Sequence, residues 1–182
     1  MRKFLPAALL VGLCLAASNV AGVQSDARQR ARELADSFSK SKHEVKEKRG
    51  VRVEKFKEVR SEPAFKQNAA DYSGEYEADS EYPLSIRVAS GGVVEVSGYE
   101  PSPRGPRRFT LRGAKVAGAL LTATKVYDDG STEKFEAVFI NRTERDRPDD
   151  AGSTEFGLGV VYDPPKVEED FTMGRLFYRL KR

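Results

Sequence analysis

From residue 71 onward, apolar and polar residues alternate in short runs, which is the period of a half-buried β-strand. Leu84, Ile86 and Val88 share one face of such a run, and apolar residues alternate in the same way over residues 135–139. Glycine, proline or aspartate ends most runs, as in the tight turns of an antiparallel meander. Counted from residues 74–78, the pattern predicts about eight strands before the chain ends.

We therefore expect a mainly β fold in residues 69–182, an antiparallel meander that closes into a small barrel or a strongly curved sheet. Eight strands suffice to close a barrel whose interior is filled by side chains or holds one small ligand. Six aromatic residues fall at positions predicted to face the interior: Tyr76, Phe109, Phe135, Phe139, Phe156 and Tyr178.

Four segments are predicted to connect these strands. Gly91-Gly92 and Asp128-Asp129-Gly130 have the residues of tight turns. A proline-rich loop spans residues 101–106, and a charged loop is expected over residues 142–152.

The residues that open the β region, Tyr72-Ser73-Gly74-Glu75-Tyr76, together with the eight-strand pattern, resemble the calycin barrels: lipocalins, fatty-acid-binding proteins and avidins. Those families begin their first strand with a Gly-x-Trp signature, and Tyr76 takes the place of the tryptophan. The chain contains no tryptophan. The resemblance implies a barrel with an interior pocket and names no ligand, since fold analogy alone does not carry function.

The N-terminus has the order of a secretory signal peptide: two positive charges at Arg2 and Lys3, an uncharged apolar run, and small residues up to Gly22. We predict a signal peptide over residues 1–22 and an exported protein, periplasmic or secreted, with a bacterial envelope favoured. A retained membrane anchor is the alternative, because the uncharged run is just long enough to span a bilayer. Leu13 before Cys14 argues against a lipoprotein. Cleavage would remove the single cysteine, which leaves the mature chain without disulfides or thiol chemistry.

Residues 23–68 are predicted to form a basic arm that is helical and partly disordered. An apolar stripe at Ala27, Ala31, Leu34, Ala35 and Phe38 predicts a helix from residue 24 to about residue 47. Residues 51–59 fit either a short strand or a helical turn. Residues 24–68 carry 13 Lys and Arg against 8 Asp and Glu, a net charge of +5, and residues 69–182 carry 16 against 20, a net charge of −4.

Candidate catalytic and metal-binding residues are few. The single histidine, His43, falls in the polar arm, whereas a catalytic base needs a pocket and positioned partners. Acidic residues cluster at residues 128–129, 146–150 and 168–170, without the alternating ligands and glycine of a calcium loop, so we interpret them as turn and surface residues. Gly157-Leu158-Gly159 lacks the strand-to-helix context of a phosphate loop and is interpreted as a strand with a bend or bulge. The sequence predicts no catalytic residue, no metal site and no cofactor, and no specific ligand-binding residue.

Other residues allow weaker functional interpretations. Arg104, Arg107 and Arg108 beside the proline-rich loop could meet an anionic ligand, and the basic arm could meet anionic lipid or nucleic acid. Export argues against nucleic acid as a partner. Asn141-Arg142-Thr143 matches a glycosylation acceptor.

Two functions follow as expectations, and neither is an enzyme. The first is an exported β-barrel module that binds a small, partly apolar ligand. The alternative is an envelope interaction module that contacts a partner protein, a cell-wall polymer or a membrane surface through its outer face and its basic arm.

Overall fold

The computed structural model describes residues 25–78, 82–89, 93–100, 102, 105–161 and 174–181. The predicted signal peptide, with Cys14, and the predicted features at residues 91–92, Arg104 and residues 168–170 lie outside these ranges. No helix in the described ranges is long and apolar enough to cross a membrane. Residues 25–36 are helical, and the remaining elements are β1 (Lys40–Lys48), β2 (Val51–Pro63), η1 (Ala69–Tyr72), β3 (Gly74–Glu77), β4 (Pro83–Val88), β5 (Val94–Glu100), β6 (Arg107–Ala117), β7 (Leu120–Tyr127), β8 (Thr132–Arg145), β9 (Ser153–Val161) and β10 (Arg175–Leu180).

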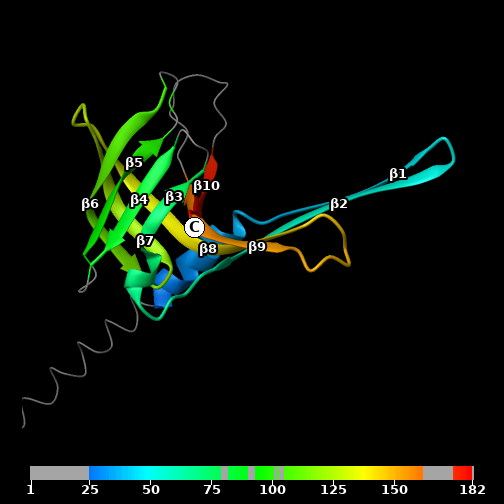
Figure 1. The fold of residues 1–182 in the computed structure, drawn as a ribbon, viewed down its shortest axis with the longest axis horizontal. Helices are drawn as coiled ribbons and strands as arrows, with labels where there is room; N and C mark the ends of the chain where they lie inside the picture. Colours follow the sequence, from blue (N-terminus) through cyan, green and yellow to red (C-terminus); the bar gives the residue numbers. More distant parts are fainter. Residues whose placement is uncertain are drawn as a thin grey trace, which may run out of the picture.

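Strands β3 to β10 form a closed antiparallel barrel (Figure 1). Each strand pairs with the next along the chain, and β10 returns to pair with β3, where Leu180 lies opposite Tyr76. Burial alternates along the strands, as in β5, where every second residue is buried. The predicted eight-strand meander is confirmed in its closed form, and it is compatible with a calycin-like barrel.

Aromatic side chains pack in the interior of the barrel. Five of the six predicted interior aromatics are at most 2% exposed, and Phe156 is partly buried. Tyr72, from η1 at one end of the barrel, stacks on Phe139 with ring centroids 4.2 Å apart. Phe139 also stacks on Phe156, and Phe109 lies 6.2 Å from Phe135. These contacts account for much of the core, because large aromatic side chains bury the most apolar area.

The helix of residues 25–36 packs on the outside of β8 and β9. Its predicted stripe is confirmed, because Ala31, Leu34 and Ala35 are at most 5% exposed and Ala27 packs against the same core. Phe38, just after the helix, lies against Gly159, where an added Cβ would approach its ring to 2.7 Å. Arg30 on the outer side of the helix contacts Glu136 of β8 through two hydrogen bonds of 3.0 and 2.7 Å.

The predicted helix is wrong beyond residue 36. Residues 40–48 form strand β1, which pairs along its whole length with β2. Residues 51–59, for which the sequence allowed a strand or a helical turn, are part of strand β2. The two residues between them, Arg49 and Gly50, have φ values of 55° and 75°. Positive φ at both central residues marks the two-residue turns whose twist matches a β-hairpin. The local turn and the cross-strand ladder therefore override a helical sequence pattern in which Val45 is the single large apolar residue after Phe38.

Strand β8 continues past the barrel and carries the hairpin. Residues 132–138 of β8 pair with β7, and residues 140–145 pair with β2 along the same edge. The strand that pairs with this edge of β8 changes from β7 to β2 at Phe139. The Phe139 N–H donates to the Ala119 carbonyl at 2.8 Å, and the Phe139 carbonyl accepts a hydrogen bond from the Ala64 N–H at 2.8 Å. The charged loop predicted from residue 142 is therefore wrong for residues 142–145, which belong to β8, and the loop itself spans residues 146–152.

Candidate functional site

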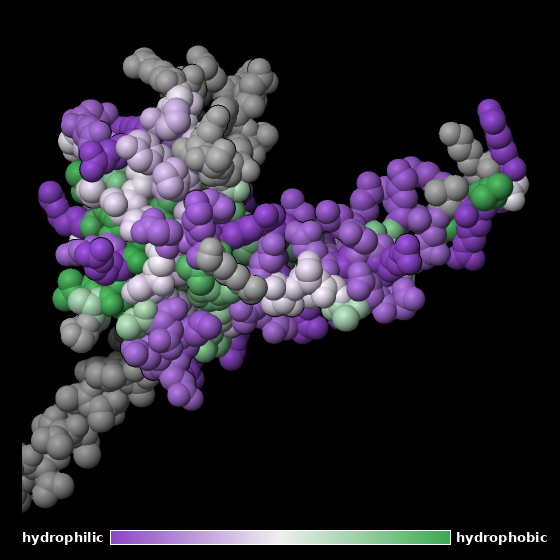
Figure 2. All heavy atoms as spheres, in the orientation of Figure 1, coloured by the Kyte–Doolittle hydropathy of each residue, from purple (hydrophilic) through white to green (hydrophobic). Residues whose placement is uncertain are grey.

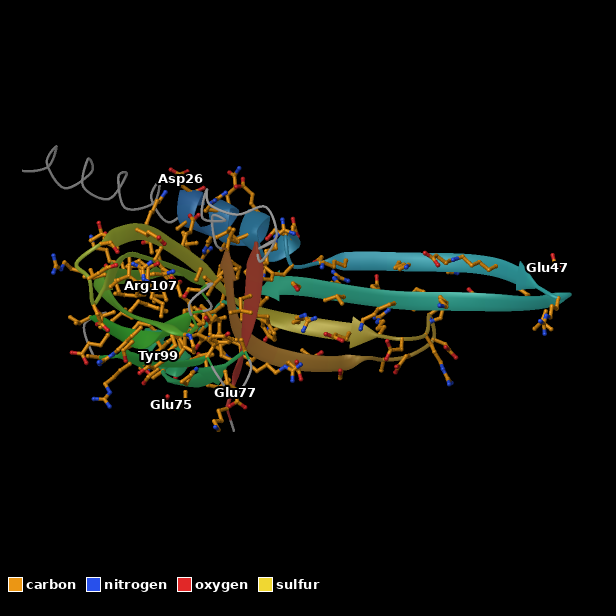
Figure 3. All side chains as sticks on the ribbon, turned by 90° about the horizontal axis from the view of Figure 1, so that it is seen from above. Asp26, Glu47, Glu75, Glu77, Tyr99 and Arg107 are labelled. Atoms are coloured by element: carbon orange, nitrogen blue, oxygen red, sulfur yellow. The ribbon has the colours of Figure 1, made fainter. Side chains whose placement is uncertain are left out.

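The β1–β2 hairpin projects from the barrel as a two-stranded ribbon (Figures 1 and 3). Its last pairing with the rest of the sheet joins Glu58 to Arg145. Beyond that pair, residues 42–57, which we call the outer hairpin, pair only with one another among the strands that the structure describes. Most of these residues are exposed, and Figure 2 shows hydrophilic residues over most of the projecting part.

The ladder sorts the charges of the hairpin between its two faces. Residues directly opposite each other in an antiparallel pair share a face, and alternate residues along each strand do as well. Among the side chains that the structure describes, one face carries Lys40, Lys42, Glu44, Lys46, Val51, Lys55, Lys57 and Val59. Five lysines against one glutamate give this lysine face a charge of +4. The opposite face carries Ser41, His43, Val45, Glu47, Arg52, Glu54, Phe56 and Glu58, three glutamates against one arginine.

Glu44 compensates part of the charge on the lysine face. Its carboxylate lies 2.9 Å from the Lys42 ammonium and 3.1 Å from the Lys46 ammonium. Hydrogen bonds from these two ammonium groups hold the pKa of Glu44 below its usual value. Lys57 approaches Glu144 of β8 at 3.8 Å. The ammonium groups remain in water, because the side chains of Lys42, Lys46 and Lys57 are 66%, 69% and 61% exposed.

His43 lies on the opposite face of the ribbon and not in a pocket. Its Nε2 is 2.5 Å from a Glu54 carboxylate oxygen, and its ring meets Phe56 edge-on with centroids 6.0 Å apart. The side chain is 52% exposed. A solvated imidazole with one carboxylate neighbour lacks the enclosed arrangement that acid–base catalysis requires.

A cluster of polar side chains lies inside the barrel, near the end of the barrel at which strands β5, β7 and β9 end. Lys125 and Glu100 form an ion pair there, with side chains 3% and 9% exposed. The Lys125 ammonium also lies 5.0 Å from the Phe109 ring centroid and 5.5 Å from that of Phe135. The Tyr127 hydroxyl is 2.7 Å from a carboxylate oxygen of Glu100. This cluster is internally paired, so we assign it a structural role.

Tyr127, itself buried, connects that cluster to residues nearer the surface. Its hydroxyl lies 2.7 Å from a Glu133 carboxylate oxygen, and its ring lies under the Arg107 guanidinium at 3.4 Å from the centroid. Burial, and then the carboxylates of Glu100 and Glu133, raise the pKa of the Tyr127 hydroxyl. Arg107 also donates a hydrogen bond of 2.9 Å to the Asp129 carboxylate. This arginine, which the sequence suggested for an anionic ligand, is therefore paired with a carboxylate of the protein itself.

A depression of about 720 Å³ lies at the opposite end of the barrel, beside the base of the hairpin. Its floor includes the partly buried Phe156 and Leu180, and Lys66 lies over the Phe156 ring at 4.7 Å. Charged side chains at its rim are paired, Arg179 with Glu155 at 3.0 Å and Lys181 with Glu77 at 3.1 Å.

The remaining predicted features have structural explanations. Asp129 accepts hydrogen bonds from the backbone N–H and the hydroxyl of Ser131 in the β7–β8 turn, and these bonds, more than Arg107, lower the pKa of its carboxyl. Asp150 accepts the Gly152 N–H, and the other acidic residues of the 146–152 loop are exposed. No group of three or more His, Cys, Asp and Glu in the described ranges could hold a metal ion.

The glycine pair of β9 is a place of close packing. Its ladders with β8 and β10 run without a register shift, so of the predicted bend or bulge the bulge is wrong. A Cβ on Gly157 would lie 2.2 Å from the Tyr178 carbonyl oxygen, and Gly159 faces Phe38. Asn141-Arg142-Thr143 lies within β8, between β2 and β9, with the Asn141 side chain exposed.

The lysine face is the functional candidate that the sequence patterns did not predict. A helical interpretation of residues 40–48 distributes the lysines around an axis, whereas a strand gathers them on one side. The signal was present in the two-residue segment Arg49-Gly50, whose glycine can supply the positive φ of a tight hairpin turn.

Together the described elements define a closed eight-stranded barrel with an outer helix and a projecting charged hairpin. Searches of protein-family models, of curated proteins and of solved structures found no match to this chain.

Proposed function

We propose that this chain is a non-enzymatic interaction module of the cell envelope, in which the barrel is the scaffold and the outer hairpin contacts the partner. The observation that carries the proposal is the outer hairpin itself. A two-stranded ribbon alone in water is marginally stable and buries little apolar surface. Such an element contributes little to the core of the barrel, whereas it extends a charged surface by about 20 Å, given the rise of a strand.

The interior of the barrel supports the scaffold role. Stacked aromatic rings and the paired Lys125 and Glu100 occupy positions that would line a ligand cavity. Export through a signal peptide over residues 1–22 remains part of the proposal, and it rests on the charge and apolar pattern of that segment.

A shortened hairpin tests this function. Deletion of residues 43–46 together with 53–56 removes four complete cross-strand pairs and keeps the turn, the base and the facing of the remaining residues. We expect the native chain to co-sediment with the envelope fraction of its host in a saturable manner, and the shortened chain to stay in the supernatant. An unchanged melting temperature of the barrel would serve as the folding control. Equal co-sedimentation of the two chains would refute the proposal.

A second candidate function is the binding of a small, partly apolar ligand, favoured by the depression over Phe156 and Leu180. Lipid extraction and mass spectrometry of protein purified from its host test it, with the variant Phe156→Ser as comparison. A stoichiometric small molecule carried by the native chain and lost from the variant would support this function. Protein free of any such molecule would exclude it.

A further inference from the structure

We infer that the lysine face binds an extended phosphodiester polymer, an inference that rests on the proposed function of the hairpin. Lys40, Lys42 and Lys46 stand along β1, and Lys55 and Lys57 stand beside them on β2. Alternate residues of one strand lie about 6.6 Å apart, and neighbouring strands lie about 4.8 Å apart. The ammonium groups thus form two adjacent rows along a surface that is two strands wide. This arrangement is complementary to an extended polymer with regularly spaced negative charges.

The need to protect an edge strand does not explain this sorting of charge. Lysines on exposed edges discourage pairing with other chains. That role is served by charge of either sign and on either face, yet among the described side chains five lysines and one glutamate lie on one face, and three glutamates and one arginine on the other. The separation points to a partner that approaches one face and carries negative charge.

The shape of the surroundings favours a thread over a flat membrane. The lysine face continues along β8 through Glu144 and Ile140, which is the side on which the helix of residues 25–36 packs. An α-helix is about 10 Å across, so it stands above the ribbon as a step that holds a flat surface away from the nearer lysines. Two-stranded ribbons also twist strongly. A flexible polymer can follow the twisted hairpin beside the helix, whereas a flat membrane surface cannot.

The side-chain chemistry suits phosphate. Among the side chains that the structure describes, all five cations that β1 and β2 place on this face are lysines. An arginine guanidinium suits planar, bidentate contacts with carboxylates and phosphates alike, whereas a lysine ammonium is a compact point charge whose rotatable donors can meet phosphate oxygens from several directions. Repeated phosphates with one delocalised charge each are the natural ligands of such a row, and each contact releases a counterion from the polymer.

The test compares three chains in fluorescence anisotropy with a labelled glycerol-phosphate oligomer. The first is the native chain, and the second carries Lys42→Gln, Lys46→Gln and Lys57→Gln. The third carries Arg112→Gln, Lys115→Gln and Lys134→Gln, which remove three exposed charges from the barrel and give the same net charge. We expect the hairpin variant to bind at least about tenfold more weakly and its salt dependence to flatten by about 2 log units per log unit of salt, since each lost phosphate contact on a single strand contributes about 0.7. The barrel variant should bind as the native chain does.

Further arms separate the possible partners. An oligothymidylate with the same number of phosphates, bound as well as the glycerol-phosphate oligomer and with the same lysine dependence, would assign recognition to the phosphates alone; weaker binding would assign part of it to the glycerol backbone. Phosphatidylglycerol vesicles bound more tightly than either polymer would overturn the inference in favour of a membrane surface.

Absence of polymer binding by the native chain, or equal weakening in the hairpin and barrel variants, would overturn it as well. If the shortened hairpin still abolishes envelope association in that case, the proposed function stands and the partner has another chemistry.

Discussion

Lys125 is a charged side chain in a place where charges are rarely found. It lies inside the barrel with its ammonium over the rings of Phe109 and Phe135 and paired with Glu100. Removing both charges from water costs several kcal/mol per ion, and their attraction offsets this only when both partners are present. The aromatic faces add a favourable cation–π term.

Loss of one partner from this pair should therefore cost more than loss of both charges. We expect Lys125→Met to lower the free energy of unfolding by about 3–5 kcal/mol, because Glu100 is left buried without its cation. The double variant Lys125→Met with Glu100→Gln should recover part of that loss. Urea unfolding at neutral pH measures both, with the exposed substitution Lys134→Met as control, expected within about 0.5 kcal/mol of the native chain. A double variant that is less stable than Lys125→Met would contradict this account.

Lys125 shares the buried face of β7 with Leu121 and Tyr127, but no sequence pattern identifies its partner. Glu100 lies 25 residues away, on β5, and β6 runs between the two strands. Only closure of the barrel brings these side chains together. In general a run of alternating residues predicts which side chains point inward, whereas their contacts depend on the order and register of the strands.

At the scale of single elements, the helix and the hairpin show where sequence patterns succeed and fail. The helix was predictable because its stripe at residues 27–38 buries apolar side chains on β8 and β9. Strand β1 was not predictable, because most of its outer residues are exposed and the sequence there shows no apolar alternation. Its conformation comes from the Arg49-Gly50 turn and from pairing with β2. Apolar periodicity in a sequence reflects which residues are buried, so a strand made of exposed residues shows no such periodicity.

The attachment of the helix to the barrel should depend on pH through Arg30 and Glu136. The hydrogen bonds from Arg30 hold the pKa of the Glu136 carboxyl below its ordinary value of 4.5. A carboxyl with a lowered pKa in the folded state contributes stability that is present above its unfolded pKa and is lost as the pH falls through the folded pKa. The Arg30 side chain is 47% exposed, so we expect a contribution of about 0.5–1 kcal/mol near neutral pH.

Glu136→Gln isolates this contribution. The difference in unfolding free energy between the native chain and the variant should be present at neutral pH and should shrink as the pH falls below 4.5, through the lowered pKa of the native carboxyl. High salt should reduce it too, because Arg30 is in contact with solvent. Asp149→Asn, an exposed loop carboxyl, is the matched control. A difference that is constant across this pH range would show that the ion pair adds nothing to the attachment.

At the scale of the whole molecule, the structure combines a densely packed barrel with a ribbon that has almost no core. Amides in the barrel open only with large parts of the fold, whereas amides of an exposed two-stranded ladder open locally. We expect hydrogen exchange in the free protein to be fast at Val45 and Phe56 and slow at Val138 and Leu158. Protection of Val45 should rise when the polymer partner is bound. Strong protection of the outer hairpin in the free protein would mean that the ribbon packs against something else.

Most of the barrel followed from the sequence, because strand number and facing are encoded in alternation over residues 74–180. Closure was one of two open outcomes, and the pairing of Leu180 with Tyr76 decides it. What lay beyond prediction was the extension of β8 past Phe139, since residues 142–145 are charged and look like a loop. They form a strand because β2 and β9 offer ladders on both edges.

That continuous strand gives the molecule a mechanical property. The ribbon joins the barrel through six residue pairs between β2 and β8, which run along the direction in which the ribbon projects. A pull on the tip therefore loads these pairs together, in shear, and does not unzip them one after another. Because β8 runs without a break from the barrel into these pairs, we expect a force on the hairpin to be transmitted to the barrel.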